Sequence, residues 1–346
     1  MTSVSVVIPC YNYGHFLENA VSSVLDDQEG VDVRILIIDD ASPDSSADVA
    51  VKIAASDPRV EVVIHSTNKG HIATYNEGLL DWADGDYSVM LSADDWLTPG
   101  ALQRATDLLD AHPGVGFVYG QSVWIEDGAP LPTPRTRVRG WSVWPGPWWL
   151  ERRFRQTYNC VPAAAVVVRT SLQKCVGGYD GRLTHSGDME MWMRLAANAG
   201  VGYLRGVDQA YYRLHGHNMY TSYTELMDLR QRRLAFEAVL DRYGERLPDA
   251  SRLSDLMYRR LSRQALRAAA RTPDGGRTQR AQVDELMAFA LSCRPEASRL
   301  PAYRAVKSHQ RIGPRAMPNL QPFVLSPFFD RAGRWLRRQS WKWRGY

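Results

Sequence analysis

Two adjacent carboxylates follow a short apolar run, "YSVML", in the first third of the chain. The four residues after this run are Ser92, Ala93, Asp94 and Asp95, and "WLTPGAL" comes next. A strand that leads into acids and then into a helix is typical of a metal site or an acid–base site. The same order of residues also fits a plain turn with a helix cap, so these residues alone leave both interpretations open.

Other residues with useful chemistry also stand where strand-like runs end. The run "VVIPCYN" ends in polar and aromatic residues, "ILIIDDASPD" carries Asp39 and Asp40, and His215 follows "YYRL". Asp188 lies at the start of the helix-like stretch "GDMEMWMRL". In an open α/β sheet, ligands bind outside the carboxyl ends of the strands. We therefore expect these residues to meet in one crevice.

Each of these residues also has a purely structural interpretation. Ser42 or Asp44 fits as a cap of the helix after "IIDD", and Asp188 fits as an acid that favours the start of its own helix. A single histidine such as His215 is more often a hydrogen-bonded polar residue than a ligand. Capping explains each acid separately, but it does not explain why all of them follow the same pattern.

The elements that would position these residues alternate between strand and helix over the first 125 residues. Strands are expected at residues 4–8, 33–39, 60–64, 87–91 and 114–126, and helices at 16–25, 44–54, 70–83 and 99–112. Pro99 suits the first turn of the last of these helices. This alternation predicts an α/β fold with βαβ units around a mostly parallel central sheet.

The remainder of the chain departs from this alternation. Residues 127–158 hold five prolines and four tryptophans, which predicts an ordered loop or flap. Further on we expect a strand at 163–169, a helix at 187–200, a strand at 209–217 and arginine-rich helices from about 221. The expected organisation is a first domain at 1–220, with halves at 1–125 and 126–220, and a helical basic region at 221–346.

Composition narrows the class of protein. The chain has 346 residues, with 45% hydrophobic and 23% charged residues and a net charge of +4, which is ordinary for a globular protein. The longest apolar stretch, "VPAAAVVV", is far shorter than the roughly 20 residues that cross a bilayer. The N-terminus lacks the features of a signal peptide, and the four cysteines are scattered. We therefore expect a cytoplasmic location.

Seven motifs, taken in order, resemble those of family 2 glycosyltransferases. They are "VSVVIPCYN", "IIDDASPD", "NKGHIATYNEGL", "GDYSVMLSADDWLTPGAL", "GGYD", "GDMEMWMRLA" and "YRLHG". Together they extend over about residues 3–217 and leave the helical region uncovered. The resemblance implies a GT-A fold, a nucleotide-sugar donor and inversion at the anomeric carbon. From the family alone, uridine diphosphate is the expected carrier.

The resemblance also implies a role for each matching residue. Asp188 corresponds to the catalytic base. The residues implied to bind the nucleotide sugar are Pro9, Tyr11, Asp39, Asp40, Lys69, Asn76, Ser92 and Asp94. The implied metal ligands are Asp94, Asp95 and His215. The expected cofactor is Mn²⁺ or Mg²⁺, which suits hard oxygen ligands and a diphosphate leaving group.

Ser92 departs from the family pattern, which reads D-x-D-D at this place. Serine keeps a hydrogen-bonding oxygen but removes one negative charge. We expect the metal site at Asp94 to survive with weaker affinity. The missing acid prompts an alternative, a non-catalytic nucleotide-sugar-binding protein on the same fold. A nucleotidyltransferase is another alternative, but it would need a Gly-rich basic loop that "IPCYNYGHF" lacks.

A stretch from Arg135 to Arg155 interleaves tryptophan with six arginines and one glutamate. Tryptophan faces stack on sugar rings, and arginines bind phosphates or carboxylates. We expect Trp148 and Arg152 to bind a sugar-like or anionic acceptor, and we expect no nucleic-acid partner. One alternative is that the tryptophans only anchor a loop. Another is peripheral contact with the inner face of a membrane, shared with the basic tail at residues 331–346.

Overall fold

The computed structural model describes residues 1–216, 218–247, 249–272, 276–312 and 345, and these form two compact units. The first unit comprises Met1–Leu150 and Asn159–Thr221, together with Gly345. The second comprises Glu151–Tyr158 and the described residues from Ser222 onward. The sequence placed a boundary at residue 220, and it did not anticipate that Glu151–Tyr158 would join the helical unit. The basic tail predicted at residues 331–346 lies outside the described residues, apart from Gly345.

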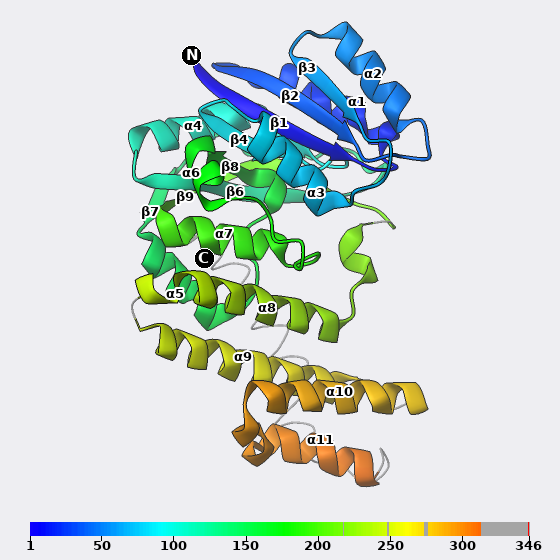
Figure 1. The fold of residues 1–346 in the computed structure, drawn as a ribbon, viewed down its shortest axis with the longest axis vertical. Helices are drawn as coiled ribbons and strands as arrows, with labels where there is room; N and C mark the ends of the chain where they lie inside the picture. Colours follow the sequence, from blue (N-terminus) through cyan, green and yellow to red (C-terminus); the bar gives the residue numbers. More distant parts are fainter. Residues whose placement is uncertain (217, 248, 273–275, 313–344, 346) are drawn as a thin grey trace. The chain divides into compact units, whose positions relative to one another are not determined.

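A nine-stranded mixed sheet forms the first unit (Figure 1). Its strands are β1 (Thr2–Cys10), β2 (Val31–Asp39), β3 (Val60–Ile64), β4 (Tyr87–Met90), β5 (Trp96–Leu97), β6 (Val115–Glu126), β7 (Gly140–Trp144), β8 (Val166–Arg169) and β9 (Gly200–Leu214). The order across the sheet is β3-β2-β1-β4-β8-β6-β9-β5, and β7 pairs with β9 off this path. Strands β1 to β4 pair in parallel, and so do β6 and β9, whereas β5, β7 and β8 are antiparallel to their neighbours.

The helices of the first unit follow from the spacing of apolar residues between these strands. They are α1 (Gly14–Leu25), α2 (Ser46–Ser56), α3 (His71–Asn76), the π-helix η1 (Glu77–Trp82), α4 (Ala101–Ala111), α6 (Thr170–Val176), α7 (Gly187–Asn198), and the short 3-10 helices η2 (Ala163–Ala165) and η3 (Met219–Ser222). Buried side chains of α1 and α4 pack on β1, β2, β4, β6 and β9 to form one core. The mixed α/β architecture with a mostly parallel curled sheet, as predicted, is confirmed.

Residues 127–158 do not form the loop or flap that the sequence predicted. Residues 127–139, Pro145, Thr157 and Tyr158 lie outside helices and strands, whereas β7 pairs with the first half of β9 and α5 spans Gly146–Gln156. Trp149 on α5 is only 1% exposed and lies edge-on to Phe117 with ring centroids 5.8 Å apart. Its indole N–H donates to the Tyr119 hydroxyl at 3.2 Å. Four of the five prolines therefore lie outside the strand and the helix, and Pro147 lies in the first turn of α5.

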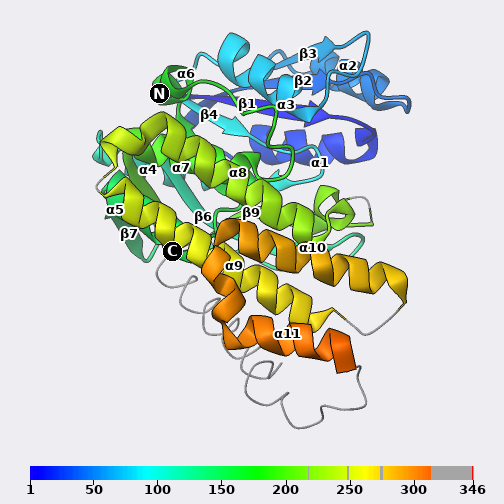
Figure 2. The same ribbon diagram turned by 60° about the horizontal axis from the view of Figure 1, so that its bottom comes forward.

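The second unit is helical, as the sequence predicted for this region. Besides the end of α5, it contains α8 (Glu225–Tyr243), η4 (Gly244–Arg246), α9 (Ala250–Arg271), α10 (Arg277–Cys293), η5 (Pro295–Arg299) and α11 (Pro301–Ile312). α9 packs against α8, α10 and α11 (Figure 2). Its buried face is apolar, with Met257, Leu261 and Ala265 fully buried, and arginines occupy its exposed face. No helix within the described ranges is both long and apolar enough to cross a membrane.

Candidate functional site

The loops after β1 and β2 are held together in a strained conformation. Asn12 and Ala41 have φ angles of 62° and 57°, in the left-handed region that residues with a Cβ rarely adopt. The Asn12 amide donates to the Ser42 hydroxyl at 3.0 Å, and the Ser42 amide donates to an Asp39 carboxylate oxygen at 3.0 Å. The Ser42 part of the capping alternative is therefore wrong, because this residue links two strand ends.

Asp39, at the end of β2, keeps one oxygen without a partner. Its side chain is only 1% exposed, and Oδ1 has no hydrogen bond to any residue that the structure describes. A buried acceptor in this state costs about 1–3 kcal/mol of stability. A donor group on a ligand would remove that cost, so the carboxylate is suited to accept from an N–H or O–H.

Asp40 fastens the loop that leads into α3. Its carboxylate accepts from the backbone amides of Lys69 and Gly70, each at 2.8 Å, and contacts the His65 Nδ1 at 2.7 Å. The other ring nitrogen of His65 lies 3.1 Å from a Glu77 oxygen, which also accepts from the Lys69 ammonium at 2.8 Å. Despite desolvation, these hydrogen bonds hold the pKa of Asp40 below its usual value. The sequence reasoning assigned no role to His65, which lies outside the seven motifs, or to Glu77, which lies within "NKGHIATYNEGL".

Asp94 and His215 meet although 121 residues separate them. The His215 Nε2 lies 3.0 Å from an Asp94 carboxylate oxygen. Arg213 supports this pair, because its backbone amide donates to Asp95 at 3.1 Å and its Nε donates to the Asp94 carbonyl at 3.1 Å. Its guanidinium also donates to Asp127 at 2.6 Å. One basic residue thus ties the end of β9 to the loop after β4.

Aromatic rings pack against Arg213 and His215, the two residues that contact Asp94. The Arg213 guanidinium lies over the rings of Phe16 and Trp96, at 4.1 and 4.5 Å from their centroids. The Tyr13 ring packs edge-on against His215 at 5.4 Å. Burial, joined by the charge of Asp94, holds the pKa of Asp95 well above its usual range. The acids therefore lie in a poorly hydrated environment, where a cation has the greatest effect on them.

Asp188 lies in the first turn of α7, where it was expected. Burial raises the pKa of its carboxyl to about 6, although a hydrogen bond with the Tyr179 hydroxyl and the charge of His185 lower it. Ser186 precedes the helix and makes no side-chain cap, so Asp188 is not the residue at the cap position. A carboxylate with this pKa is ionised at neutral pH and is still basic enough to accept a proton.

The pKa of Tyr75 depends on the charges of Asp188, Asp94 and Asp95. Burial, then the charge of Asp188, then those of Asp94 and Asp95, raise the pKa of its phenol. The Tyr75 ring lies 5.6 Å from that of Tyr179, which contacts Asp188. The charges of all three acids therefore raise the pKa of one phenol. The motif "NKGHIATYNEGL" contains Tyr75, but the sequence predicted no role for this residue.

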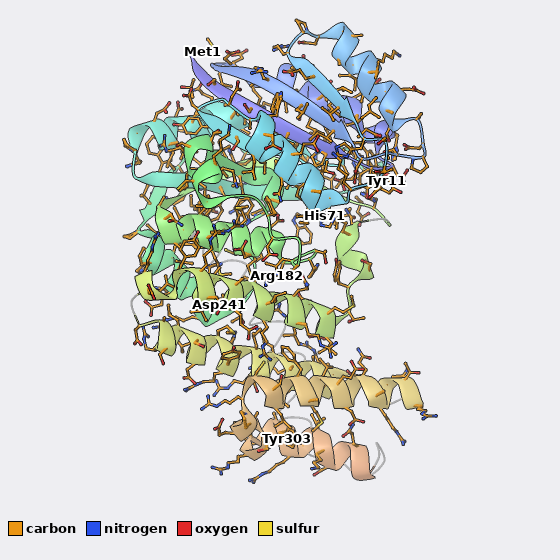
Figure 3. All side chains as sticks on the ribbon, viewed as in Figure 1. Met1, Tyr11, His71, Arg182, Asp241 and Tyr303 are labelled. Carbon is orange, nitrogen blue, oxygen red and sulfur yellow. The ribbon has the colours of Figure 1, made fainter. Side chains whose placement is uncertain are left out.

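The remaining predicted residues take varied positions. The structure brings Tyr11, which is 45% exposed, to the end of the sheet opposite Met1, and His71 lies on the same side (Figure 3). Asn76 exchanges two hydrogen bonds with the Tyr179 backbone, at 2.6 and 3.0 Å, so it joins the end of α3 to the loop before α7. Pro9 lies next to the end of β1, and the carbonyl of Ser92 accepts from the Asp95 amide in a turn.

Trp148 lies far from this cluster along β9. β7 ends at Trp144, which pairs with Val201 near the start of β9, whereas His215 follows the other end of that strand. The two ends are separated by the length of β9, a 15-residue strand. Trp148 stacks on Trp144 with centroids 5.9 Å apart, and Arg152 belongs to the helical unit. Their acceptor role stays a prediction, and this position of Trp148 favours the anchoring alternative.

A cavity of about 800 Å³ lies at the amino ends of β1 and β4, away from the cluster. The carboxylates that line it are already engaged, since Asp86 accepts from the Ser3 amide and hydroxyl, and Asp110 accepts from the Tyr87 hydroxyl. This cavity therefore lacks the unpartnered carboxylate oxygen that marks the carboxyl ends of the strands.

Metal-binding groups are few within the described residues. No group of three or more His, Cys, Asp and Glu side chains there is arranged to hold an ion. Asp94 and His215 supply a carboxylate and an imidazole 3.0 Å apart, and a divalent cation held by this pair would take its other ligands from phosphate and water.

Comparison with known proteins matches part of the chain to a protein family. Residues 5–174 match the family described as glycosyl transferase family 2. An uncharacterized glycosyltransferase of Nostoc sp. is 34% identical over 116 residues, which are 34% of this chain and 35% of that protein. The chain thus matches about a third of the length of such curated relatives.

Solved structures share the fold. S. aureus TarS residues 1–349, in complex with UDP-GlcNAc, has a TM-score of 0.63 at 17% identity, covering 90% of this chain and 92% of that one. Mannosyltransferase PcManGT from Pyrobaculum calidifontis, in complex with GDP-Man and Mn²⁺, has a TM-score of 0.51 at 15% identity, covering 98% and 82% of the two chains. At these identities the likeness shows the fold.

Proposed function

Because residues 5–174 belong to glycosyl transferase family 2, we propose that this GT-A glycosyltransferase inverts the anomeric centre as it moves a sugar from a nucleoside diphosphate to an acceptor hydroxyl. The observation that carries the proposal is that the His215 Nε2 lies 3.0 Å from the Asp94 carboxylate, while Asp188 lies in the first turn of α7. The ring of Tyr179, which contacts Asp188, lies 5.6 Å from that of Tyr75, whose pKa is raised by burial and by the charges of all three acids. These contacts support a base and metal-type donors around one substrate.

The donor's nucleoside is proposed to bind at the ends of β1 and β2. Asp39 supports this, because its buried unpartnered oxygen can accept from an imide N–H such as that of uracil. Pro9 and Tyr11 would line the base, and the loop fastened by Asp40 would place Lys69 and Asn76 beside the donor. Uridine diphosphate is the preferred carrier, in keeping with the UDP-GlcNAc that the similarly folded TarS binds.

The diphosphate is proposed to lie beside Asp94 and His215. These residues, with Asp95, would hold Mn²⁺ or Mg²⁺, and the PcManGT complex with Mn²⁺ is consistent with such a site on this fold. The cation would supply positive charge that stabilises the departing diphosphate. Arg213 orients these metal ligands, because it donates hydrogen bonds to the backbone carbonyl of Asp94 and to the carboxylate of Asp95. Ser92, at the place of the missing acid, would contribute a hydroxyl near the donor.

Asp188 is proposed to activate the acceptor. Its carboxylate removes the proton from the acceptor hydroxyl while the oxygen attacks the anomeric carbon from the face opposite the leaving group. Such a base typically contributes about 10²–10⁴ in rate. The pKa of about 6 supports this role, because the group is ionised at pH 7 without being a negligible base. Tyr179 holds the carboxylate in place through its hydroxyl.

The test is a screen of nucleotide sugars by thermal shift with Mn²⁺ present, followed by a hydrolysis assay on those that bind. A rise in melting temperature with one UDP-sugar, together with slow Mn²⁺-dependent release of UDP, is the expected result. Binding without any release, also in the presence of candidate acceptors, would favour a non-catalytic nucleotide-sugar-binding protein. Release of pyrophosphate from a sugar phosphate and UTP would instead identify a nucleotidyltransferase.

A further inference from the structure

An exposed tryptophan stands at the carboxyl ends of β6 and β9. Trp124 is 62% exposed, although it lies within a strand that pairs along its length with β9. Exposing so large an apolar side chain forgoes the free energy that its burial would provide. A strand residue of this kind is a candidate for contact with a ligand or a partner.

Trp124 forms a pair with a second aromatic ring across the strands. It lies opposite Tyr212 in the register of β6 and β9, and the two ring centroids are 5.8 Å apart with an interplanar angle of 42°. Side chains alternate along a strand, so Glu126, which is also exposed, lies on the same face as Trp124. The face therefore offers two adjacent rings with a carboxylate beside them.

The pair shares the end of β9 with the acidic cluster but lies on the opposite face of the strand, because Tyr212 and Arg213 are consecutive residues. Tyr212 precedes Arg213, whose backbone amide binds Asp95 and whose guanidinium binds Asp127. The Arg213 hydrogen bond holds the pKa of Asp127 below its usual value, and this carboxylate is 49% exposed. Asp127 is thus held by Arg213, whose side chain lies on the face away from Tyr212.

We propose that Trp124 and Tyr212 form a sugar-ring platform that binds the acceptor at the end of β9 that also carries the transfer site. The C–H face of a pyranose packs on an aromatic ring, while Glu126 accepts from its hydroxyls. The chemistry of the platform therefore fits a neutral or hydroxyl-rich sugar and disfavours a phosphate, which the Glu126 carboxylate would repel. This inference rests on the proposed glycosyltransferase function and names its acceptor class.

The rings differ in this respect from the tryptophans of the predicted acceptor stretch. Trp141 is 36% exposed, but it lies on β7 opposite Leu204, in the half of β9 far from His215, and its ring contacts His112. It offers a matched control, because it is a partly exposed strand tryptophan that lacks the neighbouring acidic cluster.

The test is binding of simple sugars by the full chain, followed by saturation-transfer NMR of the sugar ring protons. The probes are the methyl glycosides of glucose, galactose and N-acetylglucosamine, with glycerol 3-phosphate as the non-sugar arm. We expect at least one glycoside to bind, and we expect Trp124→Ala to weaken that binding about 10- to 100-fold. Trp124→Phe should retain most of the affinity, and Trp141→Ala should match the wild type.

Affinity for UDP in Mn²⁺, measured by calorimetry on the same variants, separates the two proposals. Unchanged UDP binding with lost sugar binding in Trp124→Ala supports the platform. Equal sugar affinity in Trp124→Ala and the wild type, or no glycoside bound by the wild type while UDP still binds, overturns the platform and leaves the proposed function intact. Binding of glycerol 3-phosphate that depends on Trp124 also overturns the sugar assignment. The same holds if the wild type binds anionic vesicles and Trp124→Ala does not. Failure of the wild type to bind UDP at all refutes the proposed function.

Discussion

The two ends of β9 place aromatic residues under opposite conditions. At its start, Trp144 and Tyr203 stack with ring centroids 6.2 Å apart, and nearby Trp149 is buried with its N–H satisfied by Tyr119. At its end, Tyr212 and the exposed Trp124 adjoin carboxylates, and Arg213 and His215 bind acids. The comparison favours the groups beside a tryptophan, rather than the density of tryptophans in the sequence, as the guide to a proposed binding site.

The largest expected effect lies at the carboxyl ends of the strands. Asp188→Asn should lower kcat about 10²–10⁴-fold, because the amide cannot take a proton, and donor affinity should stay near that of the wild type. Steady-state kinetics with calorimetry of UDP binding measures both. Asp81→Asn, an exposed acid on η1, is the control and should leave kcat unchanged. Transfer at the wild-type rate by a folded Asp188→Asn would show that another group is the base.

The next effect concerns stability at the amino end of β9. Trp149→Ala should lower the free energy of unfolding by about 3–5 kcal/mol, because it removes a fully buried indole and leaves a cavity. Trp148→Ala, at a partly exposed neighbour, should cost much less. Urea unfolding of both variants checks this. If Trp148→Ala with Arg152→Ala instead raises the acceptor KM without a change in Tm, the predicted acceptor role is right and the contrast between the two ends fails.

Replacing Asp94 tests its assignment as a metal ligand. Asp94→Ala should weaken Mn²⁺-dependent UDP binding at least about tenfold, because it removes a charged oxygen donor, and Asp95→Ala and His215→Ala should have milder effects. Ser92→Asp should be tolerated and should tighten metal binding, because it restores an acid. Calorimetry with UDP, with and without Mn²⁺, measures these changes. Unchanged UDP affinity in Asp94→Ala would remove this residue from the metal site.

The smallest effect is a pH dependence. Burial raises the pKa of Asp188 to about 6, so kcat/KM should fall about tenfold per pH unit below that value. The sign for stability is the reverse, because the folded state holds this proton more tightly than the unfolded chain does, where an aspartate has a pKa of about 3.9. The contribution of Asp188 to stability is therefore fullest below pH 4 and is lost as pH rises through about 6.

Two measurements check this pH dependence. A kcat/KM profile that stays flat from pH 5 to 8 would contradict the role of the carboxylate. Unfolding experiments should find Asp188→Asn more stable than the wild type at pH 8, with the difference disappearing below pH 4.

The sequence was sufficient for the parallel part of the fold, because its strands are short apolar runs separated by clear helical patterns. It also placed Asp39, Asp94 and Asp188 at the ends of elements, since "IIDD", "SADD" and "GDMEM" each interrupt an apolar run. It failed at residues 140–156, where prolines and arginines concealed a strand and a helix. Those elements are stabilised by pairing with β9 and by burial of Trp149, which are long-range contacts that local composition does not record.

The parts of the site that the sequence missed share one physical property. His65, Tyr75 and Glu77 act through residues that are distant in the chain or on other elements, and no local pattern distinguishes them from ordinary polar residues. Trp124 was read only as part of a strand, because its exposure depends on which of its neighbours cover it. Exposure and long-range hydrogen bonding are properties of the folded chain.

The carboxylate of Asp40, which holds the Lys69 and Gly70 amides, has a consequence for the rate of donor capture. Fixing the backbone of one residue costs about 1–2 kcal/mol in conformational entropy, and here that cost is met when the protein folds. Gly70 makes the fixed shape possible, because its φ of 84° is open to glycine without strain. The proposed encounter with a nucleotide therefore requires no ordering of this loop, and this segment adds no conformational step to association.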